Sequence, residues 1–434
     1  MRPLGKHLTG AASSISEPVP LPVRWAFYLL IFSLPFEMPD RTIPVETTTA
    51  TAALLIGAAM LWPTRCLRKP PAAVWLFVAY AYAYWAGVGM GGGFFATDAI
   101  RATIILLQLV LVVTIVTNIM QNHQLADRAL LIFAIACIIL AAMTMLGIGT
   151  KADVDPDSNM VRMTVFGQNA NRAARVLGTG LLVLIGLAYG RARALIRPAW
   201  LVWPFIALIA LAMIDGGSRG GLLALATGLM TYGVTGTTLK HKFRNAAVAV
   251  VVIGLVTAFV MRSPLMQERV ALASEGNLAK REQIIPNALR MFLDRPIVGW
   301  GAENEYELQK RMPQLERDSR DTHNLVLHVL TTSGLLGAVP FFLALWLAVR
   351  AAWRGRSGPL GSLPLAVLMA LLAGNMSGNY IAFKLQWVVI GLAFASYELA
   401  NRAAQAAVVA PGAMRSAVSR TRPSTRTPPL TRSI

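Results

Sequence analysis

The sequence is poor in charged residues and nearly without cysteine. Asp, Glu, Lys and Arg make up 14% of the 434 residues and 55% are hydrophobic, whereas soluble domains carry about 25% charged residues. Two cysteines support neither a disulfide framework nor a zinc site. No P-loop, dinucleotide fingerprint, zincin motif or nucleophile elbow occurs. The composition therefore points to a chain dissolved in lipid.

Long runs without Asp, Glu, Lys or Arg decide the fold class. They include 70–97, 102–126, 129–150, 220–239, 245–261, 322–349 and 357–383. A bilayer core needs about 20 apolar residues per helix, and backbone groups in lipid must pair internally. The runs do not alternate as barrel strands would. We therefore predict an all-α, polytopic membrane protein with about twelve transmembrane helices.

The expected spans occur in two groups, one before and one after the middle of the chain. They are 25–36, 49–62, 72–90, 100–120, 125–147, 173–189, 200–214, 220–234, 246–261, 325–349, 363–376 and 381–397. The first is short and its flank offers no small-residue cleavage site, so we interpret it as a retained helix.

The net charge of +19 is distributed along the chain in a way that argues for a membrane and against nucleic acid. Basic residues cluster after the second, sixth, eighth, tenth and twelfth expected helices, and the fourth is the exception. This bias is typical of cytoplasmic loops. We expect residues 1–24 and the basic tail 401–434 to be cytoplasmic, the tail being disordered from about Val408, and the protein to lie in the cell inner membrane.

One connection is much longer than the others. Residues 262–322 lie between the ninth and tenth expected helices and carry 10 basic and 10 acidic residues. Long loops inside compact architectures are usually functional or disordered. Apolar residues at helical spacing near Ile284 and Ala288 favour a folded cap on the periplasmic surface, with 25–261 and 323–400 as the membrane regions. A solvated spacer is the alternative.

Asp215-Gly-Gly-Ser-Arg-Gly-Gly221 predicts a tight turn into the eighth helix. Ser218 can cap that helix. A cation at a helix N-terminus is unfavourable unless an anion lies nearby, so Arg219 is a candidate phosphate ligand. Pairing with Asp215 or contact with lipid head groups is the alternative.

Two further candidates lie at the ends of the long loop. Arg281 has the planar fork that suits phosphate oxygens, although a loop charge is often only solvated. His323, followed by Asn324, precedes a long apolar run. If Asp321 or Thr322 caps the tenth helix, His323 lies in its first turn and stays neutral, as a general base must. A structural histidine is the alternative.

Polar residues also gather at the expected periplasmic end of the sixth helix, namely Arg162, Asn169, Asn171, Arg172 and Arg175. Near them, Asp153-Val-Asp-Pro-Asp157 resembles a metal-binding acidic motif, but an exposed, hydrated turn is the simpler interpretation. We therefore expect no metal and no cofactor.

The order of these segments resembles the O-antigen ligase/polymerase superfamily of bacterial membrane glycosyltransferases. The residues that carry the resemblance are Gly217-Ser-Arg-Gly220, Arg281 with its flanks, Pro296-Ile-Val-Gly-Trp-Gly301 and the stretch from His323-Asn324 to Gly334-Leu-Leu-Gly337. Gly167-Gln-Asn-Ala-Asn171 matches more loosely. Gly374–Tyr380 lacks the acidic residue of many relatives, so we assign it no role.

The resemblance implies a metal-independent, inverting transferase. Its donor would be undecaprenyl-pyrophosphate-linked glycan and its acceptor lipid A-core, with His323 as the base and Arg219 and Arg281 on the pyrophosphate. We add Arg172 and Arg162 as further pyrophosphate ligands, and Ser218, Asn324 and Asn171 as supporting residues. Membrane lipids are the remaining expected partners.

Two other functions stay open. A polymerase of the same superfamily would join lipid-linked repeat units, and some polymerases show Arg-then-Gly spacings that this glycine-rich chain could match by chance. A transporter or flippase should place ionisable residues near the bilayer midplane. The expected helices are almost devoid of them, which favours an enzyme, and we favour the ligase.

Overall fold

The computed structural model describes residues 18–37, 46–68, 70–91, 97–154, 161–166, 168–190, 195–274, 281–313, 322–379 and 381–420. Each expected span overlaps an α-helix. These helices are α1 (Leu21–Ser33), α2 (Thr47–Met60), α4 (Ala72–Gly91), α5 (Thr97–Ile119), α6 (His123–Leu146), α7 (Ala170–Tyr189), α8 (Trp203–Asp215), α9 (Arg219–Val234), α10 (Leu239–Val260), α14 (Leu325–Gly355), α15 (Leu363–Gly374) and α16 (Lys384–Arg420).

Among the described residues, five helices are long and apolar enough to cross a membrane, namely Ile100–Ile119, His123–Leu146, Ala170–Tyr189, Leu239–Val260 and Leu325–Gly355. Further apolar helices are shorter, among them Leu21–Phe36 and Thr47–Met60. The chain is therefore a helical membrane protein. That all twelve helices cross the bilayer stays a prediction.

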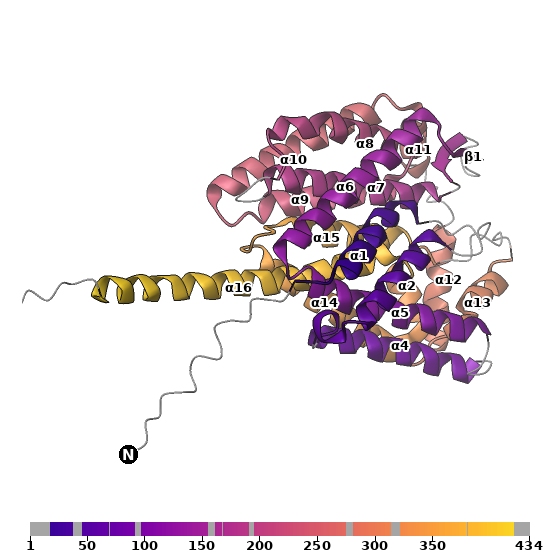
Figure 1. Cartoon of the computed structure of the whole chain (residues 1–434). Helices are drawn as coiled ribbons and strands as arrows, with labels where there is room; N and C mark the ends of the chain where they lie inside the picture. Colours follow the sequence, from indigo (N-terminus) through magenta and orange to yellow (C-terminus); the bar gives the residue numbers. More distant parts are fainter. Residues whose placement is uncertain are drawn as a thin grey trace, which may run out of the picture.

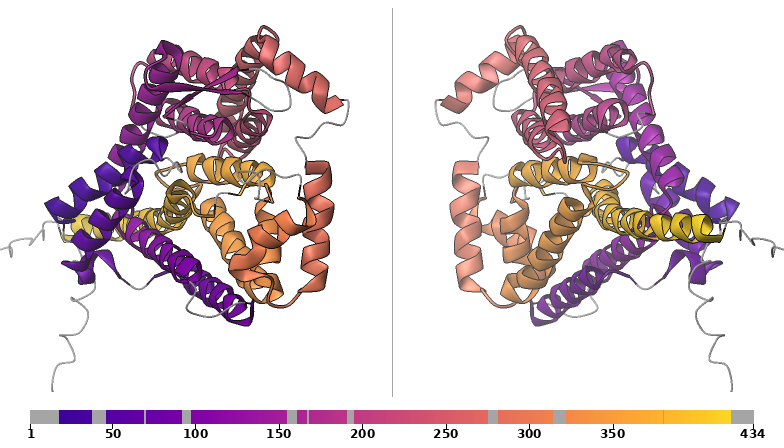
Figure 2. Two further views of the ribbon diagram at one scale, coloured as in Figure 1. Left: turned by 90° about the vertical axis from the view of Figure 1, so that its right-hand side faces the viewer. Right: turned by 90° about the vertical axis from the view of Figure 1, so that its left-hand side faces the viewer.

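The long loop contains helices of its own. They are α11 (Pro264–Ser274), α12 (Arg281–Asp294) and α13 (Asn304–Arg311), with the 3₁₀ turn η3 (Gly301–Glu303) before α13. Ile284, Met291, Leu308 and Met312 form a small apolar core within it. Figure 1 shows α11, α12 and α13 at one end of the molecule, opposite the far end of α16, and Figure 2 shows α11 and α12 along the outer edge. The described part of the loop is folded.

Short elements complete the described chain. They are η1 (Leu34–Phe36), α3 (Pro63–Cys66), η2 (Ala199–Val202) and η5 (Asn375–Ser377). One β-hairpin departs from the expected all-α fold. Strands β1 (Thr150–Val154) and β2 (Val161–Val165) pair antiparallel, with Asp153 opposite Arg162. Asp153 therefore lies on a strand and not in a turn, whereas Asp155 and Asp157 lie outside the described residues.

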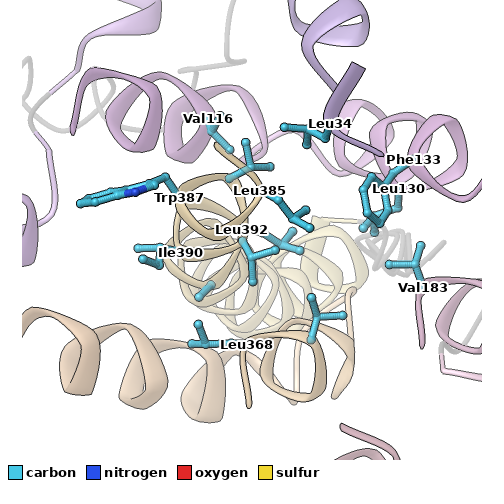
Figure 3. Packing of buried hydrophobic residues seen from close by; sticks show 14 of the residues in the cluster. Leu34, Val116, Leu130, Phe133, Val183, Leu368, Leu385, Trp387, Ile390 and Leu392 are labelled. Atoms are coloured by element: carbon cyan, nitrogen blue, oxygen red, sulfur yellow. The ribbon is translucent and has the colours of Figure 1, made fainter. Parts of the chain in front are cut away.

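The first turns of α16 form the centre of the core. Trp387, Ile390 and Leu392 are buried, and Figure 3 shows them surrounded by side chains of several other elements. Those side chains are Leu34 of η1, Val116 of α5, Leu130 and Phe133 of α6, Val183 of α7 and Leu368 of α15. Beyond this core α16 continues as a helix to Arg420. The disordered tail expected from about Val408 stays a prediction.

Two of the glycine-rich strings seen in the sequence contact each other. At Gly334 the backbone of α14 leaves helical geometry, with a φ of 56°, and the freed amides of Leu335 and Leu336 donate to Pro296 O (2.8 Å) and Ile297 O (3.0 Å). A side chain at Gly334 would collide with the backbone of Ile297. The string 296–301 thus enters the break in α14 and fixes the end of α12 against the helix bundle.

Candidate functional site

Two arginines from distant elements donate to one residue. Arg175 of α7 donates through Nη2 to the carbonyl oxygen of Ser377 (3.1 Å) and to its Oγ (3.0 Å). Arg281, the first residue of α12, donates to the same carbonyl oxygen (3.0 Å). A carbonyl oxygen is neutral, so it orients the guanidiniums without cancelling their charge. We call Arg175, Arg281 and Ser377 the Ser377 cluster.

Glycines make room for this cluster. A methyl group added at Gly220, in the first turn of α9, would overlap Ser377 Oγ. One added at Gly374 would lie 2.9 Å from Cδ of Arg175. Arg175 is 5% exposed, so this guanidinium lies in a poorly hydrated environment. Electrostatic interactions are stronger there than in bulk water.

Asn324 connects the start of α14 to the same turn. Its Oδ1 accepts from the amides of Val326 (2.9 Å) and Leu327 (3.1 Å), and its Nδ2 donates to Met376 O (3.3 Å). Asn324 is therefore the N-cap of α14. The predicted cap at Asp321 or Thr322 is wrong for Thr322, which lies outside the helix, whereas Asp321 lies outside the described residues.

His323 consequently lies before α14 and not in its first turn. Its φ of 49° falls in the left-handed region, which is uncommon for residues other than glycine. Strained backbone of this kind gathers at functional sites, where the surrounding contacts hold it. The contacts of Asn324 provide that support. The ring is half-buried, and the expected place of His323 in the first turn of α14 is wrong.

Ser218 and Arg219 begin α9. Ser218 Oγ accepts from the amide of Gly221 (3.0 Å), which confirms the predicted cap. Gly217 has a φ of 61°, and a side chain there would contact Leu265 of α11 at 2.8 Å. Arg219 Nη1 donates to the carbonyl oxygen of Arg269 in α11 (2.8 Å). The structure thus directs Arg219 toward α11, while its neighbour Gly220 packs on Ser377.

The other predicted residues lie at the start of α7 and before it. The guanidinium of Arg172 stacks on the ring of Phe383, 3.6 Å from its centroid. Asn171 lies in the first turn of α7, where its backbone N–H donates to Oδ1 of the N-cap residue Asn169 (3.0 Å). Arg162 lies on β2, and its side chain is outside the described part of the structure.

A cavity separates Arg172 and Arg175 from the N-terminal helices. Besides these arginines, Glu37, Gln168, Asn375 and Gln386 contribute polar groups to its wall. Gln168 donates to the carbonyl oxygens of Pro35 (2.9 Å) and Glu37 (2.8 Å), and Asn375 donates to Gln386 (2.7 Å). These polar groups lie between the Ser377 cluster and the N-terminal helices, in a cavity whose wall is otherwise apolar.

A buried lysine lies close to this cavity. Lys384, the first residue of α16, contacts Glu37 at 3.0 Å and Glu46 at 2.9 Å, and it donates to Thr49 (3.0 Å). We call Lys384, Glu37 and Glu46 the Lys384 cluster. Burial raises the pKa of the Glu37 carboxyl, against the opposing effect of Lys384.

Arg175, Ser377 and Lys384 were not among the predicted site residues. The position of Arg175 in the sequence could have marked it as an anion ligand, because it is a cation near the start of a helix. Ser377 gave none, since its carbonyl oxygen is the main acceptor and every residue has one. Lys384 appears in the sequence as a single cation directly after a long charge-free run, which is a rare position for a buried charge.

Two comparisons with known proteins agree on the family. The family model described as O-antigen ligase matches residues 204–342, which include α9, the long loop and the start of α14. The chain is also 27% identical to a curated O-antigen ligase of Pseudomonas aeruginosa over 236 residues. That match covers 51% of this chain and 52% of the relative, so the chain spans about half the length of the relative it matches. These findings confirm the resemblance of the chain to O-antigen ligases that the sequence showed.

Proposed function

We propose that this protein is an O-antigen ligase that transfers glycan from undecaprenyl pyrophosphate to lipid A-core at the periplasmic face of the inner membrane. The observation that carries the proposal is the meeting of Arg175 and Arg281 at Ser377, beside the turn that bears His323 and Asn324. In this arrangement the arginines proposed to bind pyrophosphate lie close to the residue proposed as the general base.

Pyrophosphate leaves the donor with at least two negative charges. Guanidiniums that are already oriented in a poorly hydrated site stabilise that charge as it develops, without reorganising. Arg281 and Arg175 are the first candidates because both donate to Ser377. Arg219 and Arg172 would extend the contact, and Arg162 stays a candidate from its sequence alone.

His323 is the proposed general base. A sugar hydroxyl of the acceptor attacks the anomeric carbon of the donor, and His323 takes the hydroxyl proton. The new glycosidic C–O bond forms while the C–O bond to pyrophosphate breaks, and undecaprenyl pyrophosphate leaves with both bonding electrons. Attack opposite to the leaving group inverts the anomeric carbon. A positioned base contributes about 10²–10⁴-fold to such a step.

Deleting the gene and examining lipopolysaccharide on a gel tests the proposal in the cell. Loss of the ligase should leave bare core, because finished glycan is no longer attached. Loss of a polymerase should instead leave core carrying a single repeat unit. That second pattern would assign the protein to the polymerase branch.

Transfer by the purified protein tests the chemistry. We expect full activity in excess EDTA, since the proposed reaction uses arginines where other glycosyltransferases use a divalent metal ion. Activity that disappears in EDTA and returns with magnesium would contradict a metal-independent mechanism. Movement of lipid-linked glycan across vesicles without transfer would instead support a transporter.

A further inference from the structure

A second pair of arginines lies far from the Ser377 cluster. Arg350 and Arg354 are one turn apart near the end of α14, and both are exposed. Like charges at this spacing repel each other. Within the described part of the chain neither guanidinium forms a hydrogen bond or ion pair, and Arg350 contacts only the ring of Trp346, at 5.4 Å. The pair therefore has the charge to hold an anion.

The two arginines lie on the wall of an open cleft. Its volume is about 330 Å³, which lies at the lower end of the range of small-molecule sites. Its wall comes from the start of α4, the last turns of α14 and the middle of α16. Ala73, Leu347 and Phe394 make it largely apolar, and Glu398 is the one acidic residue among the described residues that line it. An amphipathic anion fits this combination.

The cleft lies near the opposite membrane surface from His323. Arg350 is 25 residues beyond Leu325, which corresponds to about 38 Å along a helix, and the hydrocarbon core measures about 30 Å. Trp346 and Trp353 on the same turns are 55% and 48% exposed. Exposed tryptophans with neighbouring arginines are typical of the boundary between lipid and water. The cleft is therefore within reach of lipid head groups and lies far from the proposed glycan site.

We infer that this cleft binds an anionic phospholipid, with the phosphate on Arg350 and Arg354 and an acyl chain along the apolar wall. Two arginines against one glutamate leave the wall with a net positive charge, which matches a lipid of net charge −1 such as phosphatidylglycerol. Basic pockets between transmembrane helices bind anionic head groups in this way.

Native mass spectrometry of the full chain in detergent, titrated with phosphatidylglycerol, tests the inference. The double variant Arg350→Gln/Arg354→Gln should bind phosphatidylglycerol at least about tenfold more weakly than the parent protein. The control Arg68→Gln/Arg356→Gln removes the same two charges from residues that do not line the cleft, and it should bind like the parent. Ala72→Phe fills the cleft without changing charge, and it should weaken binding too.

Three results would overturn the inference. Equal losses in the double variant and the control would mean that only net charge attracts the lipid. Equal binding of phosphatidylcholine would remove the role of the arginines as an anion site. Full displacement by millimolar inorganic phosphate would identify free phosphate, rather than a lipid, as the ligand. Melting temperatures without lipid establish that each variant is folded.

Discussion

The Ser377 cluster and the Lys384 cluster lie on either side of the connection between α15 and α16, and they differ in the groups that their cations contact. In the Lys384 cluster the ammonium contacts two carboxylates, at 3.0 Å and 2.9 Å. In the Ser377 cluster two guanidiniums meet a neutral carbonyl oxygen. The first group sets one positive charge against two carboxylates, whereas a neutral carbonyl oxygen orients the guanidiniums without offsetting their charge.

The difference indicates separate roles. Glu37 follows η1 and Glu46 precedes α2, so the Lys384 cluster ties the N-terminal helices to the central helix α16. Its lysine already has anionic partners within the protein. In the Ser377 cluster, the proposed function puts the pyrophosphate of the donor against the guanidiniums. Changes in the first should therefore affect stability, and changes in the second should affect binding of the donor.

The largest effect is expected for Lys384→Met. It leaves the carboxylate of Glu37, which is 4% exposed, buried without its lysine, and breaking a buried pair in this way costs about 3–5 kcal/mol. We expect a much lower melting temperature of the purified protein. Donor affinity of the protein that remains folded should stay close to normal. A melting temperature like that of the parent would remove the structural role of the cluster.

The pH dependence of this variant sharpens the test. Burial raises the pKa of Glu37 above its unfolded value, and the loss of Lys384 raises it further. Such a group stabilises the fold below its unfolded pKa, and this contribution is lost as the pH rises through the folded pKa. The melting temperature of Lys384→Met should therefore recover as the pH falls. Adding Glu37→Gln should abolish that recovery.

His323→Ala should reduce turnover at least about a hundredfold, because it removes the proposed base. Donor binding should change little, since His323 is not proposed as a pyrophosphate ligand. His328→Ala, within α14, is the matched control and should retain substantial activity. Single-turnover transfer at saturating donor and acceptor measures the effect. Loss of donor affinity in His323→Ala would place the histidine in the anion site instead.

Arg281→Ala and Arg175→Ala should each weaken undecaprenyl pyrophosphate binding by about 1.5–3 kcal/mol, the contribution of a charge-assisted hydrogen bond. Arg219→Ala should do the same if its guanidinium leaves the carbonyl of Arg269 for the donor. Lysine at these positions should rescue only in part, because an ammonium cannot engage two oxygens in the fork geometry.

Arg290→Ala is the matched control for the arginine variants, because Arg290 is an exposed arginine on the same helix as Arg281. Its donor affinity, measured by titration of the purified protein, should equal that of the parent. Equal losses in Arg290→Ala and Arg281→Ala would mean that the net charge of the loop, and not the Ser377 cluster, attracts the donor.

Local sequence signals predicted the helices and part of the site. Each expected apolar span overlaps a helix, and Ser218 caps α9 as expected. The cap of α14 lies two or three residues after the predicted Thr322 or Asp321, at Asn324, which also donates to Met376, 52 residues away. The contact between Gly334 and Ile297 is equally non-local. Periodicity and spacing report on neighbours along the chain, so neither contact could be predicted.

The smallest effect is expected for Ser377→Ala. The substitution removes the Oγ acceptor of Arg175 but leaves the carbonyl oxygen that both arginines contact. One typical hydrogen bond is worth about 0.5–1.5 kcal/mol, so donor affinity should fall between about twofold and tenfold, less than in either arginine variant. Turnover at saturating donor should hardly change, because His323 is untouched. Titration of the purified variant with undecaprenyl pyrophosphate measures the difference. A loss as large as that of Arg281→Ala would show that the hydroxyl of Ser377, and not its carbonyl oxygen, orients the arginines. The comparison of the two clusters would then name the wrong atom of Ser377.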